Sequence, residues 1–247
     1  MSVRLSVSAV MILWCAAALA QQGGGAAVSQ ANFNLSGGYA ESDHLGVQDV
    51  MLDANLPLGS LFGLNGQFQR RWLDASDDAA VDADSTRGQV GLYARDPGRG
   101  VLGVEYERER FDFARADDLD ARTYRGVLVM YDRAFDLILR RARTRYSIDG
   151  PDPDDRDTAS AALAGYAGSN ARLAAGYGLM ATKGDIDVTL AYQPAFAGNK
   201  VALELGYQDL DNAGPVYDKG KIYSGRLVYY FGTPMTLMMR HRRALLP

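Results

Sequence analysis

Cysteine, histidine and long apolar stretches are scarce in this 247-residue chain. Its one cysteine, Cys15, lies in an N-terminal segment that we expect to be removed, which excludes disulfides, thiolate metal sites and a cysteine nucleophile from the mature chain. Mean hydropathy is slightly negative, which argues against a bundle of membrane-spanning helices. Lys and Arg number 26 against 30 Asp and Glu, so a basic surface for nucleic acid is not supported either.

The first twenty residues have the order of a secretory signal peptide. Arg4 precedes an apolar stretch from Leu5 to Ala17, and Ala18-Leu19-Ala20 places small residues where signal peptidase accommodates them. We therefore expect cleavage after Ala20 and export of the protein. An uncleaved membrane anchor would need a longer apolar stretch followed by charged residues. Residues 21–30 (QQGGGAAVSQ) are predicted to form a flexible lead-in.

From Asn32 onward, apolar side chains recur at every second position. One example is the alternation of Val50, Leu52, Ala54 and Leu56 with Asp49, Met51, Asp53 and Asn55. A period of two indicates β-strands with one apolar and one polar face. No segment has a convincing long helical period, so we predict an all-β fold.

Breaks in this alternation divide the chain into about twelve strands. Short connections such as 57–60 and 96–100 take turns with mostly longer, acidic ones such as 73–86 and 147–157. Short turns at one end, long loops at the other and an even strand number are typical of a closed antiparallel up-and-down transmembrane β-barrel, which we place at residues 31–232. The strands are predicted near Asn32–Ala40, Val47–Leu56, Leu61–Trp72, Gly88–Arg95, Val101–Phe113, Thr123–Tyr131, Phe135–Tyr146, Thr158–Ala167, Ala171–Thr182, Ile186–Tyr192, Lys200–Gln208 and Lys221–Gly232.

The polar face of the strands distinguishes a membrane barrel from a soluble sandwich or lipocalin-like barrel. It carries Asp, Glu, Arg, Gln and Asn deep in many strands, and a dry core would hold these side chains only at a large desolvation cost. Lipid outside and water inside fit this pattern. Aromatic side chains on the apolar face, several of them near strand ends, fit an interfacial girdle: Tyr39, Trp72, Tyr106, Tyr192, Tyr207, Tyr229 and Phe231.

The last predicted strand, Ile222–Phe231 (IYSGRLVYYF), alternates and ends in an aromatic residue. Together with the signal peptide, the cysteine-free mature chain and the order of turns, it resembles the closing strand of Gram-negative outer-membrane β-barrels of the small-porin kind. The resemblance is architectural and covers about Ala31 to Phe231. It implies an outer-membrane location, contact with membrane lipid and lipopolysaccharide, and recognition by the barrel-assembly machinery; a homo-oligomer stays open. Arg108 and Arg110 would meet lipopolysaccharide phosphates if they face outward at the rim.

Sixteen residues (GTPMTLMMRHRRALLP) follow Phe231, whereas such barrels usually end at the terminal aromatic residue. We predict that residues 233–247 form a periplasmic C-terminal tail. Four of its side chains suit solvent: Arg240, His241, Arg242 and Arg243. Three others suit a plug or cap of the periplasmic mouth: Met235, Leu237 and Met239. Both arrangements are open at this point.

The alternation also assigns charged side chains to the lumen. They are Asp49, Asp53, Glu105, Glu107, Glu109, Asp187 and Glu204, together with Arg71, Arg95, Arg125, Arg140, Arg172 and Arg226. The strand with Arg140, Arg141, Arg143 and Arg145 does not alternate cleanly, so we predict a β-bulge near Arg140 that turns Arg143 and Arg145 inward. The candidate pore-lining residues are Glu105, Glu107, Glu109, Arg71, Arg95, Arg125, Arg140, Arg143 and Arg226.

A charged lumen has two interpretations. An acidic and a basic ladder form a constriction that selects solutes by field and size, which predicts a porin-like channel for passive diffusion of small polar or charged solutes. Alternatively, the charges neutralise one another and fill the barrel, which predicts a non-conducting barrel with a structural, partner-binding or surface-display role. We favour the channel. Both signs line the wall, so ion selectivity does not follow.

Catalysis and metal binding have little support. A hydrolase barrel would need a base such as His44, which stands beside Ser42 and Asp43 and is interpreted as an exposed loop residue. The acidic loops lack the spacing of an EF-hand and are interpreted as a solvated rim. These loop acids include Asp74, Asp77, Asp78, Asp82, Asp84 and those of 152–157. We expect no enzyme activity, no cofactor, no metal and no nucleic-acid partner.

Overall fold

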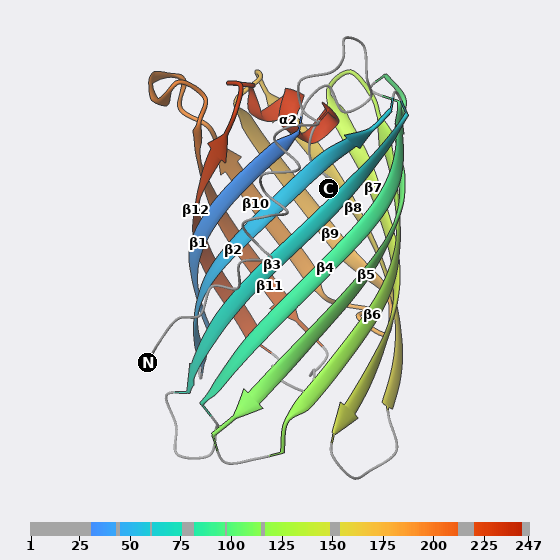
Figure 1. Cartoon of the computed structure of the whole chain (residues 1–247), viewed down its shortest axis with the longest axis vertical. Helices are drawn as coiled ribbons and strands as arrows, with labels where there is room; N and C mark the ends of the chain where they lie inside the picture. Colours follow the sequence, from blue (N-terminus) through green and yellow to red (C-terminus); the bar gives the residue numbers. More distant parts are fainter. Residues whose placement is uncertain are drawn as a thin grey trace.

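The computed structural model describes residues 31–42, 45–59, 61–75, 82–96, 98–114, 117–148, 154–211 and 220–243. They form a closed barrel of twelve strands, in which each strand pairs antiparallel with the next and β1 pairs with β12 (Figure 1). The predicted fold class is therefore confirmed. The strands are β1 (Asn32–Glu41), β2 (Leu45–Leu58), β3 (Phe62–Ala75), β4 (Ala83–Asp96), β5 (Gly100–Phe113), β6 (Leu119–Tyr131), β7 (Phe135–Ile148), β8 (Asp154–Ala167), β9 (Ala171–Met180), β10 (Ile186–Tyr192), β11 (Val201–Leu210) and β12 (Gly220–Phe231).

The two ends of the barrel differ in their connections. At the short-turn end, residues 59–61, 97–99, 132–134 and 168–170 join successive strands, and the short 3-10 helix η1 (Ala195–Ala197) lies between β10 and β11. The opposite end, where β3 leads into β4 and β7 into β8, is called the loop end below. Helix α2 (Leu237–Arg243) follows β12 and lies at the short-turn end, which is uppermost in Figure 1. No helix in the described ranges is long and apolar enough to cross a membrane.

Residues that alternate along each strand of the sequence point alternately into the lumen and out of the barrel wall. On β5, Glu105, Glu107 and Glu109 are buried, whereas Leu102 and Val104, at the alternate positions of the same strand, are more than half exposed. The same division continues around the barrel. Large exposed apolar side chains include Leu35, Val50, Phe68, Val90, Leu128, Leu163, Leu173, Leu190, Leu203 and Leu227. An apolar outer wall around a polar interior is the arrangement that lipid contact requires.

Several strands reach further toward the loop end than predicted. β4 begins at Ala83 and not at Gly88, and β6 begins at Leu119 and not at Thr123. Most of the added residues carry polar side chains, which the sequence pattern assigns to loops. In the barrel, outward Asp120 forms a 2.5 Å ion pair with Arg108 on the next strand, so the ladder continues beyond the apolar band.

The predicted bulge near Arg140 is wrong. β7 pairs regularly with β6 and β8 through this region, and the register shift lies instead between β8 and β9 at Ala159 and Ser160. Arg140 therefore points inward, whereas Arg143 and Arg145 point outward. The Arg143 side chain is 60% exposed and forms a 2.7 Å ion pair with Asp155 of β8.

Apolar side chains line the inner wall of β4 to β9 at the short-turn end. The cluster consists of Tyr93, Val101, Val127, Val129, Ile138, Ala162, Ala164 and Ala174, with Tyr131 packed against it. Above this layer, the tail after Phe231 folds back: Met235 and Leu237 are buried, and Arg240, which would suit solvent, is fully buried. The predicted signal peptide and lead-in (residues 1–30) and His44 lie outside the described residues.

Candidate functional site in the barrel lumen

One side of the lumen carries a ladder of ion pairs that runs along β5. Its three glutamates are buried, and each meets an arginine from a neighbouring part of the wall. Arg125 Nη1 lies 2.6 Å from Glu105 Oε2, Arg87 Nε lies 3.2 Å from Glu107 Oε2, and Arg71 pairs with Glu109. Ser85 Oγ donates a further 2.7 Å hydrogen bond to Glu109. The predicted acidic ladder is therefore present, but as a neutralised network.

The polar network continues across β1, β2, β3 and β12. Arg226 Nη2 lies 2.6 Å from Asp49 Oδ2, and Gln69 donates to the same oxygen. Deeper in the barrel, Asp53 accepts hydrogen bonds from three asparagine side chains: Asn34 at 3.2 Å, Asn55 at 2.5 Å and Asn65 at 3.0 Å. These amides solvate the buried carboxylate in place of water.

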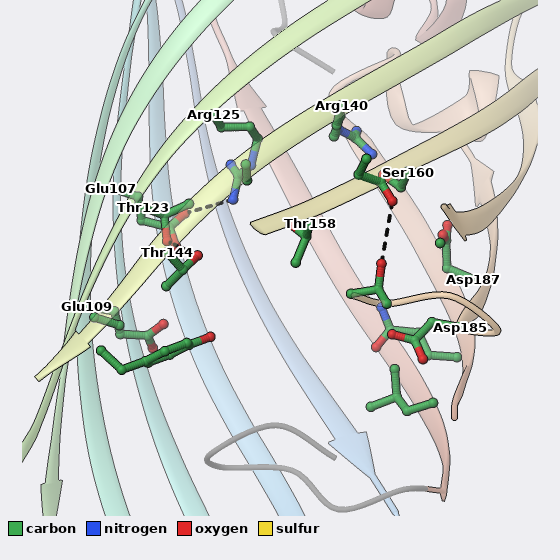
Figure 2. Close-up of a pocket in the computed structure, with 18 of the residues that line it drawn as sticks. Glu107, Glu109, Thr123, Arg125, Arg140, Thr144, Thr158, Ser160, Asp185 and Asp187 are labelled. Carbon is green, nitrogen blue, oxygen red and sulfur yellow. Dashed lines mark hydrogen bonds and ion pairs between the residues drawn. The ribbon is translucent and has the colours of Figure 1, made fainter. Parts of the chain in front are cut away.

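The opposite side of the lumen is lined by small side chains, which leave it open. Inward positions of β8 and β9 include Ser160, Ala162, Ala164, Ala174, Gly176 and Gly178. A cavity of about 480 Å³ lies against this side and extends from Phe111 and Tyr146 near the loop end to Arg140 and Asp187 (Figure 2). A second cavity of about 540 Å³ is lined by Asp49, Arg226 and Glu204. Both cavities touch Arg71, Gln208 and Leu210, so together they form a polar vestibule.

The tail helix lies across the other mouth. Met238 N donates to the Ser169 carbonyl at 3.0 Å, and Arg240 Nη2 donates to the Asn199 carbonyl at 2.9 Å. The Arg240 guanidinium also lies 3.9 Å from the centroid of the Tyr230 ring. Enclosure lowers the pKa of His241 well below its ordinary 6.5, and the positive charges of Arg172, Arg95 and Arg240 lower this pKa further. The helix is thus held by several turns of the short-turn end.

The predicted lumen residues divide into three groups. Those that line the vestibule are Glu107, Glu109, Arg71, Arg125, Arg140 and Arg226. Glu105 is buried in the ion ladder, and Arg95 lies in the apolar layer with its guanidinium 5.0 Å from the Tyr93 ring centroid. Arg143 lies on the outer face, so it does not line the lumen. A role of the inward residues in solute passage stays a prediction.

Sequence reasoning missed several inward charges. Arg87 falls between the predicted connection 73–86 and the predicted strand that begins at Gly88, and extending the alternation of Gln89 and Gly91 backward by one step places it inside. Asp136 shares the inward parity of Arg140 on the same predicted strand, whereas Arg240 and Arg242 lie in the tail, to which no alternation applies.

The outer face near the loop end carries arginines on adjacent strands. Arg108, Arg122 and Arg145 occupy one row of the sheet, since Arg108 pairs in register with Arg122 and Arg122 with Arg145. The next row toward the short-turn end contains Tyr106 and Tyr124, whose ring centroids lie 5.2 Å apart. A row of aromatic side chains that lies deeper in the membrane than a row of cationic side chains is the order expected at a membrane interface.

No family model matches this chain, and no curated protein matches it in sequence. Solved structures do match its fold. An outer-membrane channel from Pseudomonas putida F1 is 14% identical, with a TM-score of 0.61 over 86% of this chain and 98% of the other. The KdgM porin, in a complex with disordered oligogalacturonate, is 10% identical, with a TM-score of 0.52 over 81% and 99%. The Pseudomonas putida toluene transporter TodX is 11% identical, with a TM-score of 0.50 over 87% and 91%. At these identities the likeness establishes a shared barrel fold.

Proposed function

We propose that the protein is an outer-membrane channel for small polar or charged solutes. The observation that carries the proposal is a polar vestibule inside a closed barrel whose outer wall is apolar. Water-filled cavities lined by both signs of charge accept polar solutes more readily than lipid does. The fold shared with outer-membrane channels supports the same conclusion.

The orientation follows from the connections. In transmembrane barrels the short turns face the periplasm and the longer loops face outward. In the proposed orientation, the vestibule opens to the outer side and α2 lies at the periplasmic mouth. Solutes would enter from outside, contact the ion ladder and meet the tail helix last.

A non-conducting barrel is the second candidate, and a specific observation favours it. The apolar layer around Tyr93 and Val129, together with α2, occupies the periplasmic end of the lumen. In the channel proposal α2 moves aside, whereas in the second candidate it stays in place.

A hydrolase has weaker support. His44 lies outside the described residues, and His241 is enclosed in the tail helix beside Tyr166, 6.4 Å between ring centroids. A neutral, enclosed imidazole at the end opposite the vestibule does not reach a substrate there.

Single-channel recording separates the two barrel candidates. The refolded chain from Gln21 onward is compared in a planar bilayer with a variant that ends at Gly232 and so lacks α2. We expect discrete conductance steps, brief in the longer chain and sustained in the truncated one. A salt gradient then gives the ion selectivity. Silence of both proteins, each verified as a heat-modifiable barrel, would overturn the channel proposal in favour of the non-conducting barrel.

A further inference from the structure

Two oppositely charged residues that line the first of the two vestibule cavities have no ion-pair partner among the described residues. They are Arg140 of β7 and Asp187 of β10, and both line the 480 Å³ cavity. Figure 2 places them on two sides of the same cavity, with Ser160 between them. Arg71, Arg125 and Arg226, in contrast, are each paired with a carboxylate.

The register explains why this pair does not close. Arg140 lies beside Ser160, and Asp187 lies beside Gly176, so β8 and β9 stand between the two charges. Three interstrand steps and an offset of two residues along the strand separate their Cα atoms by about 16 Å along the wall. The inward residues Ser160 and Gly176 between them are too small to fill this space, whereas the space over Gly178 is occupied by Thr182.

Asp187 is directed toward the gap. A Cβ atom on Gly176 would lie only 2.1 Å from Asp187 Oδ1, so the carboxylate lies directly over the glycine of the neighbouring strand. Because β9 lies between β10 and β8, this direction brings the negative charge toward Ser160 and Arg140. The other acid near this part of the cavity, Asp185, already accepts a 2.9 Å hydrogen bond from the Asp211 backbone.

A ligand that carries only one charge fits this site poorly. A simple carboxylate would be attracted by Arg140 but repelled by Asp187, and a simple amine would be attracted by Asp187 but repelled by Arg140. A small zwitterion satisfies both, and the hydroxyl groups of Thr158 and Ser160 add hydrogen-bonding capacity at the cavity wall.

We propose that Arg140 and Asp187 form a binding site for zwitterions of the α-amino acid class. Arg140 binds the carboxylate through charge-assisted hydrogen bonds, and Asp187 binds the ammonium group. The site rests on the proposed channel function, in which it is the point where an entering solute pauses before it reaches the apolar layer.

The test measures binding without requiring conduction. Saturation-transfer difference NMR on the detergent-solubilised full chain compares L-alanine with propionate and ethylamine, which keep only one charge each. We expect saturation transfer to L-alanine and at least about tenfold weaker binding of the other two, since each loses one charged hydrogen-bonded contact. Equal binding of propionate and L-alanine would overturn the proposal and identify an anion site.

Three variants make the assignment specific. Arg140→Gln and Asp187→Asn are each expected to weaken L-alanine binding about tenfold. Arg143→Gln, on the outer face of the same strand as Arg140, is the matched control and should bind L-alanine as the unchanged chain does. Unchanged binding by the first two variants would overturn the site. If L-alanine binds but neither the chain from Gln21 nor the variant that ends at Gly232 conducts in the bilayer, the channel proposal fails and the binding site stands. If these proteins conduct but L-alanine does not bind, the channel proposal stands and the binding site fails.

Discussion

Arg242 of the tail helix and Asp136 of β7 form an ion pair inside the short-turn mouth, with Nη2 and Oδ1 2.7 Å apart. The Asp136 carboxylate is almost completely buried and also accepts a 2.8 Å hydrogen bond from the Tyr166 hydroxyl. Arg242 donates further to the carbonyl oxygens of Asp132 and Phe135, and its guanidinium lies 5.3 Å from the Tyr131 ring centroid. This one side chain therefore ties the end of the chain to the turn between β6 and β7.

Replacing Arg242 is expected to release the tail. In Arg242→Gln, Asp136 keeps the Tyr166 hydroxyl but loses its cation, and a buried charge without its partner costs about 1–3 kcal/mol. We expect the open fraction in single-channel records to rise about tenfold or more. Arg133→Gln, in the same turn and exposed, is the control and should behave as the unchanged chain. An unchanged open fraction in Arg242→Gln would contradict a gating role of α2.

Acidification is also expected to release the tail, through His241. Its pKa in the docked helix is well below 6.5, because the ring is enclosed and Arg172, Arg95 and Arg240 lie near it. Protonation therefore favours the released helix, so docking is strongest above about pH 6.5 and weakens as the pH falls toward the docked pKa. Because one group titrates, the equilibrium constant for docking falls by at most about tenfold for each pH unit.

The open fraction between pH 7.5 and pH 5 measures this effect. His241→Phe keeps a ring against Tyr166 and removes the titration, so its open fraction should stay flat over that range. An equal pH response in the variant would assign the titration to other groups.

The alternation of the sequence predicted the wall well because lipid and lumen impose opposite polarity on alternate residues. The positions of Glu105, Glu107 and Arg125 followed from parity alone. The same reasoning failed for Arg143, since it assumed that every outward side chain is apolar. Near the loop end the outer face leaves the apolar band, and there Arg143 and Asp155 pair across strands.

The tail and the pairing of the lumen charges depend on contacts that no local pattern contains. Arg240 meets Asn32, 208 positions away, and Arg226 meets Asp49, 177 positions away. Closure of the barrel brings β1 and β12 together and creates these contacts. Arginine side chains are stable in solvent and also against the carbonyl oxygens and tyrosine rings that line the short-turn mouth. Composition alone therefore does not decide whether the tail is in solvent or docked in the mouth.

The lumen network is expected to stabilise the barrel. Arg125 pairs with Glu105 and Glu107, both buried, so Arg125→Gln should lower the free energy of unfolding by about 2 kcal/mol. Arg143→Gln removes an exposed pair and should change it by less than about 1 kcal/mol. Urea unfolding in lipid vesicles, followed by the fluorescence of Trp72, measures both. Equal effects would mean that the lumen is as well hydrated as the outer rim.

The outer wall is expected to respond to charge according to depth. Leu128 lies in an apolar row with Leu102 and Leu139, whereas Tyr124 lies beside Arg143 in the row nearer the loop end. Leu128→Arg should destabilise the barrel by about 2–4 kcal/mol, and Tyr124→Arg by about 0–1 kcal/mol. The same unfolding assay in vesicles gives both values. A small effect at Leu128 would place this row outside the hydrocarbon region.

The row of Arg108, Arg122 and Arg145 is expected to bind the phosphates of lipopolysaccharide. Its arginines are more than half exposed and pair with Asp120 and Asp155, and pairs of exposed arginines contribute little, so a phosphate with two or more charges can compete for them. Replacing all three arginines by Gln should weaken binding of lipopolysaccharide about tenfold, as measured by native mass spectrometry of the refolded barrel. Monophosphoryl lipid A should bind the unchanged chain more weakly than the bisphosphorylated form. The control replaces Arg99 and Arg133, both exposed at the short-turn end, and should leave binding unchanged. If the control loses as much binding as the triple variant, the attraction is general net charge and the row is not a site.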